Sequence, residues 1–153
     1  MKDILTLSDA IHLAFSRPEY APEIKRDEKG VLLSMTTHCN QFVSEVLSFI
    51  GFGDLEGKMA NDIVDFIKAH PQWSEVSMDK CQALANAGTF VIAGIKAPVH
   101  GHVAIICPGK EKSSGRWGQV PSCASVGKEN TIGRGINWAF SEMPSFFAYR
   151  PTL

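Results

Sequence analysis

The hydrophobic pattern of the chain changes its period near Thr89. Before that residue, apolar side chains recur every three or four positions, which predicts helices over residues 39–50, 59–70 and 78–87. After it, the apolar residues gather in the compact runs TFVIAGI and HVAIIC, joined by a segment that contains glycine and proline. Such runs predict neighbouring strands. Helices followed by a meander of strands indicate the α+β class, with helices packed on one face of an antiparallel sheet.

Short sequence patterns predict the secondary structure of the rest of the chain. Ser8 is expected to cap a short N-terminal helix, and residues 17–30 are expected to form a loop or one side of a cleft. The run RWGQVPSCASVG can form a further strand if its proline lies at an edge or a bulge. The runs INWAF and SFFAYR are expected to supply one or two more strands.

Length and charge limit the classes of function. At 153 residues the chain can form one domain, residues 1–153, with its own apolar core. The 15 Lys and Arg residues and 16 Asp and Glu residues give a net charge of −1, so counterion release does not favour a nucleic-acid partner. No run approaches the roughly 18 apolar residues of a membrane span, and the N-terminal residues lack the pattern of a secretory signal. We therefore expect a protein made in the cytoplasm, without a membrane span, that stays there or leaves by a route that reads no such signal.

Cys39 lies where the buried face of the clearest predicted helix begins. Phe42, Val43, Val46 and Leu47 form that face, and extending it backward by three or four positions reaches Cys39. A thiol at the first turn of a helix is favoured as a thiolate, because free N–H groups and the helix dipole stabilise negative charge there. The same N–H groups could stabilise the oxyanion that forms when a carbonyl is attacked. The other cysteines are expected to be reduced, partly buried apolar residues: Cys81, Cys107 and Cys123.

His102 is the candidate base for this thiol, because it opens an apolar strand directly after Gly101. The glycine permits close backbone approach, so the imidazole would be held rigidly and could meet Cys39 if this strand packs beside the helix. A cysteine–histidine pair is the minimum machinery for acyl transfer through a thioester. His38 is another possible base, although adjacent residues at a helix start usually point apart.

The segments that carry these two residues resemble a known family. CNQFV at the start of a helix, followed by GHVAII on a strand, is similar to the NlpC/P60 and CHAP cysteine peptidases of the papain-like superfamily. CNQFVSEVLSFIGF, GKMANDIVDFI and ANAGTFVIAGIKAPVHGHVAII further resemble the small type VI secretion amidase effectors, bacterial toxins that cut the peptide stems of peptidoglycan. The resemblance covers about residues 36–127. It implies a papain-like NlpC/P60 core with N-terminal helices packed on an antiparallel sheet.

The resemblance also implies roles for individual residues. Cys39 would be the nucleophile, with its backbone N–H in the oxyanion hole, and His102 would be the general base that later protonates the leaving amine. A third residue would orient the histidine from the following strand. Ser122 is the first choice and Gln119 the second, with a backbone carbonyl as the alternative.

The implied substrate is peptidoglycan, cleaved in its stem peptides between γ-D-Glu and meso-diaminopimelate. The implied enzyme needs no cofactor and no metal. As an antibacterial effector it would act in the periplasm of a target cell after secretion. A cognate immunity protein would protect the producer.

Other functions stay open. A housekeeping or phage-type peptidase would cut the diaminopimelate–D-Ala cross-link, and an acyltransferase on the same scaffold would pass the acyl group to an acceptor other than water. A zinc site could combine His100 and His102 with Cys39 or Cys107, although no HExxH-like pattern accompanies them. In a non-catalytic adaptor, Cys39 would only be packed, and Cys39→Ala would change stability but no activity.

Overall fold

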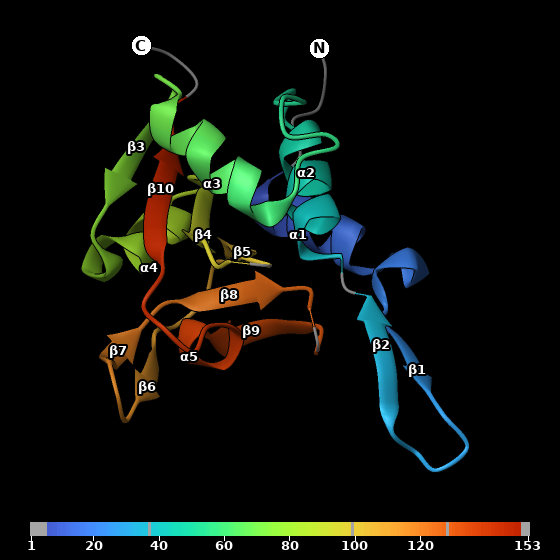
Figure 1. Ribbon diagram of the computed structural model, residues 1–153. Coiled ribbons are helices and arrows are strands. Elements are labelled where there is room, and N and C mark those ends of the chain that lie inside the picture. Colours follow the sequence, from blue (N-terminus) through green and yellow to red (C-terminus); the bar gives the residue numbers. More distant parts are fainter. Residues whose placement is uncertain (1–5, 37, 99, 128, 151–153) are drawn as a thin grey trace.

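The computed structural model describes residues 6–36, 38–98, 100–127 and 129–150 and has an α+β architecture, as the sequence predicted (Figure 1). Its elements follow one another along the chain in this order: α1 (Leu7–Phe15), η1 (Pro18–Tyr20), β1 (Glu23–Arg26), β2 (Leu32–Thr36), α2 (Cys39–Ser48), α3 (Ala60–Ala69), β3 (Trp73–Val76), α4 (Met78–Asn86), β4 (Val91–Ile95), β5 (His102–Ile106), β6 (Lys112–Ser114), β7 (Gly118–Val120), β8 (Ser122–Ser125), β9 (Thr131–Gly135), α5 (Ile136–Ala139) and β10 (Ser145–Tyr149). Residues 1–5, which bear on the expectation about a secretory signal, lie outside the described residues. None of the helices in the described ranges is both long enough and apolar enough to cross a membrane.

The main sheet has the strand order β3-β10-β4-β5-β8-β9, and each neighbouring pair in it is antiparallel. In the pairing of β4 with β5, Gly94 lies opposite Val103 and Ile95 lies opposite His102. Consecutive residues of both strands are buried. Because consecutive side chains point to opposite faces of a sheet, the central strands are covered on both faces, and not only on one.

The predicted helices of the N-terminal half are confirmed as α2, α3 and α4. α2 and α3 lie side by side and pack against β5, and α3 also contacts β4 (Figure 1). The packing of α3 on the sheet is close, because a Cβ atom at Gly94 would lie 2.8 Å from Cγ2 of Val64. Apolar residues of α1, α2, α3, α4 and the main sheet join in one continuous core.

Several local assignments made from the sequence are wrong. Thr6, and not Ser8, caps α1, because Thr6 Oγ1 accepts a hydrogen bond from the Asp9 N–H at 3.1 Å. The run INWAF contains the helix α5 and not a strand, since so short an apolar run does not distinguish the two. The run SFFAYR forms β10 as expected.

Proline and the N-terminal loop account for the remaining differences. Pro121 divides the predicted strand RWGQVPSCASVG into β7, which pairs with β6, and β8, which pairs with β5 and β9. Proline has no N–H to donate to a strand ladder, so a break there is physically reasonable. Residues 17–30, expected to be a loop, contain η1 and β1. β1 pairs with β2 in a hairpin that projects from the body of the molecule just before α2 (Figure 1).

Candidate active site

Cys39 is the first residue of α2, and it is buried, with 7% of its surface exposed. The Phe42 N–H donates to the His38 carbonyl at 3.0 Å, so the N–H groups of Cys39, Asn40 and Gln41 precede this hydrogen bond of the first helical turn. Such N–H groups carry the positive end of the helix dipole. The thiol therefore lies at the helix start that the sequence predicted, but its burial outweighs the N–H groups, so the thiolate that the sequence favoured is disfavoured there.

Two opposing effects act on the thiol. Burial raises the pKa of Cys39 above its ordinary value, and hydrogen bonds from the backbone of Val103, Asn40 and Cys39 itself oppose that rise. Of these three backbone groups, Val103 lowers the pKa of the thiol most. Val103, one of these backbone groups, directly follows His102 in β5, the strand that begins with the candidate base. The interface between α2 and β5 thus brings Cys39 and the start of β5 together.

His102 is enclosed by residues from the C-terminal half of the chain. Its Nε2 lies 2.9 Å from Oγ of Ser125, a β8 residue with 3% of its surface exposed. The Phe140 ring packs beside the imidazole, with ring centroids 4.9 Å apart. Gly127 lies against the ring as well, since a Cβ atom there would be 3.3 Å from Cε1. This burial lowers the pKa of His102 from 6.5 to about 4.

A neutral imidazole has one nitrogen that donates and one that accepts. With the proton on Nε2, the Nε2–H donates to Ser125 Oγ, and Nδ1 is the nitrogen left to accept a proton. Because the pKa of His102 is lowered to about 4, the ring is neutral near pH 7. The histidine is therefore in the protonation state that a general base requires.

Asn61 of α3 holds the segment that leads into His102. Its Nδ2 donates to the Ala97 carbonyl at 2.8 Å, and its Oδ1 accepts from the Ala97 N–H at 3.2 Å. Gly101 lies against the same amide, and a Cβ atom there would overlap Asn61 Oδ1 and the Ile95 carbonyl oxygen. No other residue fits at this position without displacing its neighbours. The close backbone approach predicted at Gly101 is confirmed.

The orienting residue predicted on the following strand is placed differently. Ser122 Oγ donates to the Lys110 carbonyl at 2.6 Å, and Gln119 Nε2 donates to a serine hydroxyl of β6 at 3.1 Å. Ser125, later in the strand that begins with Ser122, is the residue that hydrogen-bonds His102. Ser122 and Gln119 therefore bond elsewhere, and Ser125 is the residue that can orient His102.

Strand register explains why the sequence pointed to the wrong serine. Ile105 pairs with Ala124 and Ile106 with Cys123, so extending the same register puts Gly127 opposite His102. A residue two positions before Gly127 shares the face of the sheet with His102, which is the position of Ser125. Ser122 is an odd number of positions away and faces the other side. The segment SCAS contains two serines, and only the register of β8 against β5 shows which of them faces His102.

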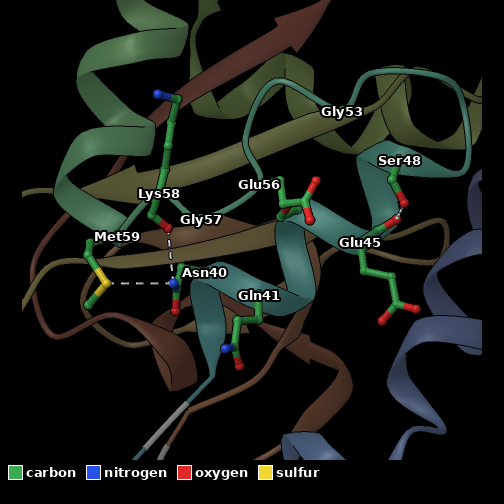
Figure 2. Close-up of a pocket in the computed structure, with 10 residues that line it drawn as sticks. Asn40, Gln41, Glu45, Ser48, Gly53, Glu56, Gly57, Lys58 and Met59 are labelled. Carbon is green, nitrogen blue, oxygen red and sulfur yellow. Dashed lines mark hydrogen bonds between the residues drawn. The ribbon is translucent and has the colours of Figure 1, made fainter.

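Two hollows in the described part of the chain lie near Cys39 and His102: His102 lines one of them, and Cys39 lines neither. The loop hollow, about 340 Å³, has His102 in its wall and is lined by residues of the β4–β5 loop and of the segment that follows α5: Ile95, Lys96, Ala97, Pro98, His100, Gly101, His102, Ala139, Phe140, Ser141 and Glu142. The α2 groove, about 630 Å³, begins at Asn40, the residue after Cys39 (Figure 2). It is lined by the solvent-facing side of α2 and by the α2–α3 loop: Asn40, Gln41, Ser44, Glu45, Ser48, Gly53, Glu56, Gly57, Lys58 and Met59. Volumes of this size are typical of ligand sites.

The zinc site considered from the sequence has no ligand set in this part of the structure. Within the described residues, no three or more His, Cys, Asp or Glu side chains gather where they could hold a metal ion. His100 is exposed in the β4–β5 loop, whereas Cys107 is buried at the end of β5. The remaining cysteines are free and buried, as expected: Cys81, Cys107 and Cys123.

The arrangement supplies the groups that nucleophilic acyl transfer needs. It combines a thiol at a helix start, backbone N–H groups around it, and a neutral imidazole at the start of the adjacent strand. When the sequence is compared with models of protein families and with curated proteins, neither comparison finds a match. A function for the chain must therefore be argued from the chemistry of these side chains.

Proposed function

We propose that the chain is a cysteine peptidase, or amidase, that cleaves the stem peptides of peptidoglycan between γ-D-Glu and meso-diaminopimelate. Cys39 is its nucleophile and His102 its general base. The observation that carries the proposal is the packing of α2, which starts with Cys39, against β5, which starts with His102. The resemblance of the sequence to small type VI secretion amidase effectors supplies the class of substrate.

The chemistry begins with a neutral pair. As the Cys39 sulfur attacks the carbonyl carbon of the scissile amide, His102 Nδ1 takes the thiol proton, and the C=O electron pair moves to oxygen. The N–H groups at the start of α2 are available to stabilise this oxyanion. When the carbonyl re-forms, the C–N bond breaks, and His102 gives its proton to the leaving amine. The product at this stage is a thioester on Cys39.

Hydrolysis of the thioester follows the same chemical steps, with water as the nucleophile. As the oxygen of the water attacks the thioester carbonyl, His102 takes a proton from the water. His102 then gives that proton to the departing sulfur of Cys39. Ser125 favours both halves of the reaction, because a hydrogen bond to a charged imidazolium is stronger than one to a neutral ring. Proton transfer accompanies each attack, since burial disfavours a resting thiolate–imidazolium pair.

We also propose a papain-like NlpC/P60 core for the chain. This is supported by three features: a helix that starts with cysteine, its packing on a strand that starts with histidine, and a polar residue on the next strand. The same resemblance supports delivery as an antibacterial type VI secretion effector and a cognate immunity protein in the producer.

The test of the activity uses purified sacculi. Incubation with the protein should release new amino groups, and mass spectrometry of the fragments should find a free amine at the former γ-D-Glu linkage of diaminopimelate. Cys39→Ala and His102→Ala should abolish the release while the circular dichroism spectrum is unchanged. Cys81→Ala and His12→Ala are matched controls elsewhere in the fold and should keep the activity.

Other outcomes of this experiment decide between the alternatives. Fragments cut at the diaminopimelate–D-Ala bond would identify a cross-link peptidase. Activity that survives Cys39→Ala but is lost with a chelator would identify a metal enzyme. No release by any of the proteins would contradict the proposal.

The site of action is tested by directing the protein to different compartments of a Gram-negative host. Fusion to a periplasmic signal should lyse the cells, whereas the same protein kept in the cytoplasm should be harmless. Cys39→Ala should be harmless in both places. Equal toxicity in the cytoplasm would contradict the cell wall as the target.

A further inference from the structure

The side chain of Tyr20, the last residue of η1, is fixed to the helix that carries Cys39. Tyr20 is buried, with 8% of its surface exposed, and its hydroxyl donates to the Glu45 carboxylate on α2. Its ring packs edge-on against that of Phe42, on the buried face of α2, with the ring centroids 6.0 Å apart. Burial, together with Glu45, raises the pKa of Tyr20, so its hydroxyl keeps its proton and remains the donor.

The backbone of Tyr20 is fixed to the other side of the site. Asn130, just before β9, donates from Nδ2 to the Tyr20 carbonyl at 2.7 Å. Its Oδ1 accepts a hydrogen bond from the Gly127 N–H at 3.0 Å. Gly127 is the glycine that lies against the His102 ring. The two bonds of this one amide, which we call the Asn130 bridge, therefore connect η1 and α2 to the backbone beside the base.

The bridge joins parts of the site that the other contacts of His102 leave within one half of the chain. Ser125 bonds to the imidazole from β8, and Phe140 packs on it from the end of α5. The bridge instead reaches α2, and it adds to the packing of α2 against β5. A nucleophile and its base work only at the right separation, and a misplacement of about 1 Å can cost on the order of a hundredfold in rate.

We propose that Asn130 is a positioning residue, and that its bridge holds His102 in place relative to Cys39. This inference rests on the proposed function, in which the two residues react as a pair. Asn130 lines neither the loop hollow nor the α2 groove, so it acts through Tyr20 and Gly127 and not on the substrate.

Loss of the bridge should also change the surroundings of the imidazole. Burial lowers the pKa of His102, so release of Gly127 from the ring should let water approach and raise this pKa toward its ordinary value. The other titratable groups nearby are the thiol at the start of α2 and the charged or titratable residues of the loop hollow, which are Lys96, His100 and Glu142. A substitution at Asn130 leaves all of them in the protein.

The kinetic test uses the soluble peptide L-Ala-γ-D-Glu-meso-diaminopimelate. Asn130→Ala should lower kcat about ten- to a hundredfold and leave KM almost unchanged. Asn86→Ala is the matched control, because the Asn86 amide makes the same pair of bonds to Gly109, at 3.0 and 2.9 Å, beyond the opposite end of β5 from His102. It should keep kcat. An equal loss of kcat in Asn86→Ala would overturn the proposal.

A second variant separates the bridge from the turn that it closes. Asn130→Asp can still accept from the Gly127 N–H but cannot donate to the Tyr20 carbonyl. Because this change cuts the link to η1 and keeps the other bond, it should lower kcat as well. Full kcat in Asn130→Asp would overturn the bridge.

Proton NMR of the His102 ring gives a readout that needs no cleavage. Its Cε1–H signal is identified by its absence from His102→Gln. The ring should titrate near about pH 4 in the original protein and in Asn86→Ala. In Asn130→Ala it should titrate at least about one pH unit higher.

The two readouts keep the two proposals apart. If the original protein cleaves the peptide but either kcat or the titration is unchanged in Asn130→Ala, the positioning role is overturned and the peptidase stands. If the titration shifts but the original protein does not cleave, the hold of Asn130 on His102 is supported and the peptidase is overturned. Neither cleavage nor a shift would overturn both.

Discussion

The burial of His102 should make the free energy of unfolding fall in acid, and His102→Gln should remove much of that fall. Burial lowers the pKa of the folded-state imidazole from 6.5 to about 4. Between these values, the unfolded chain binds a proton that the folded protein does not. Acid therefore favours the unfolded state. The stability that the neutral imidazole contributes is present above pH 6.5 and is lost as the pH falls toward about 4.

The size of the effect follows from the shift in pKa. Each pKa unit corresponds to about 1.4 kcal/mol, so the full shift from 6.5 to about 4 corresponds to about 3 kcal/mol. At about pH 5, the His102 imidazole is almost fully protonated in the unfolded chain and mostly neutral in the folded one. About 2 kcal/mol should be lost by that point. The other histidines occur in both proteins, so their titration cancels when the two are compared.

Urea unfolding followed by circular dichroism measures this difference at about pH 7.5 and about pH 5. Between these conditions the original protein should lose about 2 kcal/mol more stability than His102→Gln. Glutamine is chosen because its amide can still bond to Ser125 but does not titrate. His12→Gln, on the exposed side of α1, should keep the acid sensitivity of the original protein. Equal losses in the original protein and in His102→Gln would refute the argument that His102 is shielded from water.

Three further predictions concern the same site. Ser125→Ala leaves a ring nitrogen of the half-buried His102 without its partner, so it should cost about 1 kcal/mol of stability and lower the rate of amine release from sacculi; an unchanged rate would contradict an orienting role. Gly101→Ala forces a methyl group onto Asn61 and should lower the melting temperature by several degrees, at about 1–3 kcal/mol for an overpacked site; an unchanged temperature would contradict the close contact. Alkylation of Cys39 by iodoacetamide, read by peptide mass spectrometry, should be slow near neutral pH and faster in alkali, because burial raises the pKa of the thiol; a rate independent of pH would contradict this.

Parts of the site could be predicted because their signals are local. The spacing of Phe42, Val43, Val46 and Leu47 predicts α2 and its inward face, and these residues are fully buried in the structure. Cys39 at the start of that helix follows from the same pattern. The strand that begins with His102 follows from the apolar run after Gly101.

The errors arise where local signals compete. Pro121 breaks a stretch that otherwise has the composition of a strand, and β7 and β8 on its two sides belong to different sheets. The β1–β2 hairpin and β3 were missed because each of their strands is only four or five residues long. In such segments, tertiary pairing outweighs intrinsic preference.

By itself, the sequence determined the α+β class, the helix that begins with Cys39 and the strand that begins with His102, because hydrophobic period and chain-breaking residues act over a few neighbouring positions. Only the tertiary structure decided which groups meet: the helix that begins with the thiol packs on the strand of the imidazole, and the imidazole bonds to Ser125 in place of Ser122. Those contacts depend on the register of β5 against β8 and on the packing of α2 against β5. Residues far apart in the chain set both, so no local pattern records them.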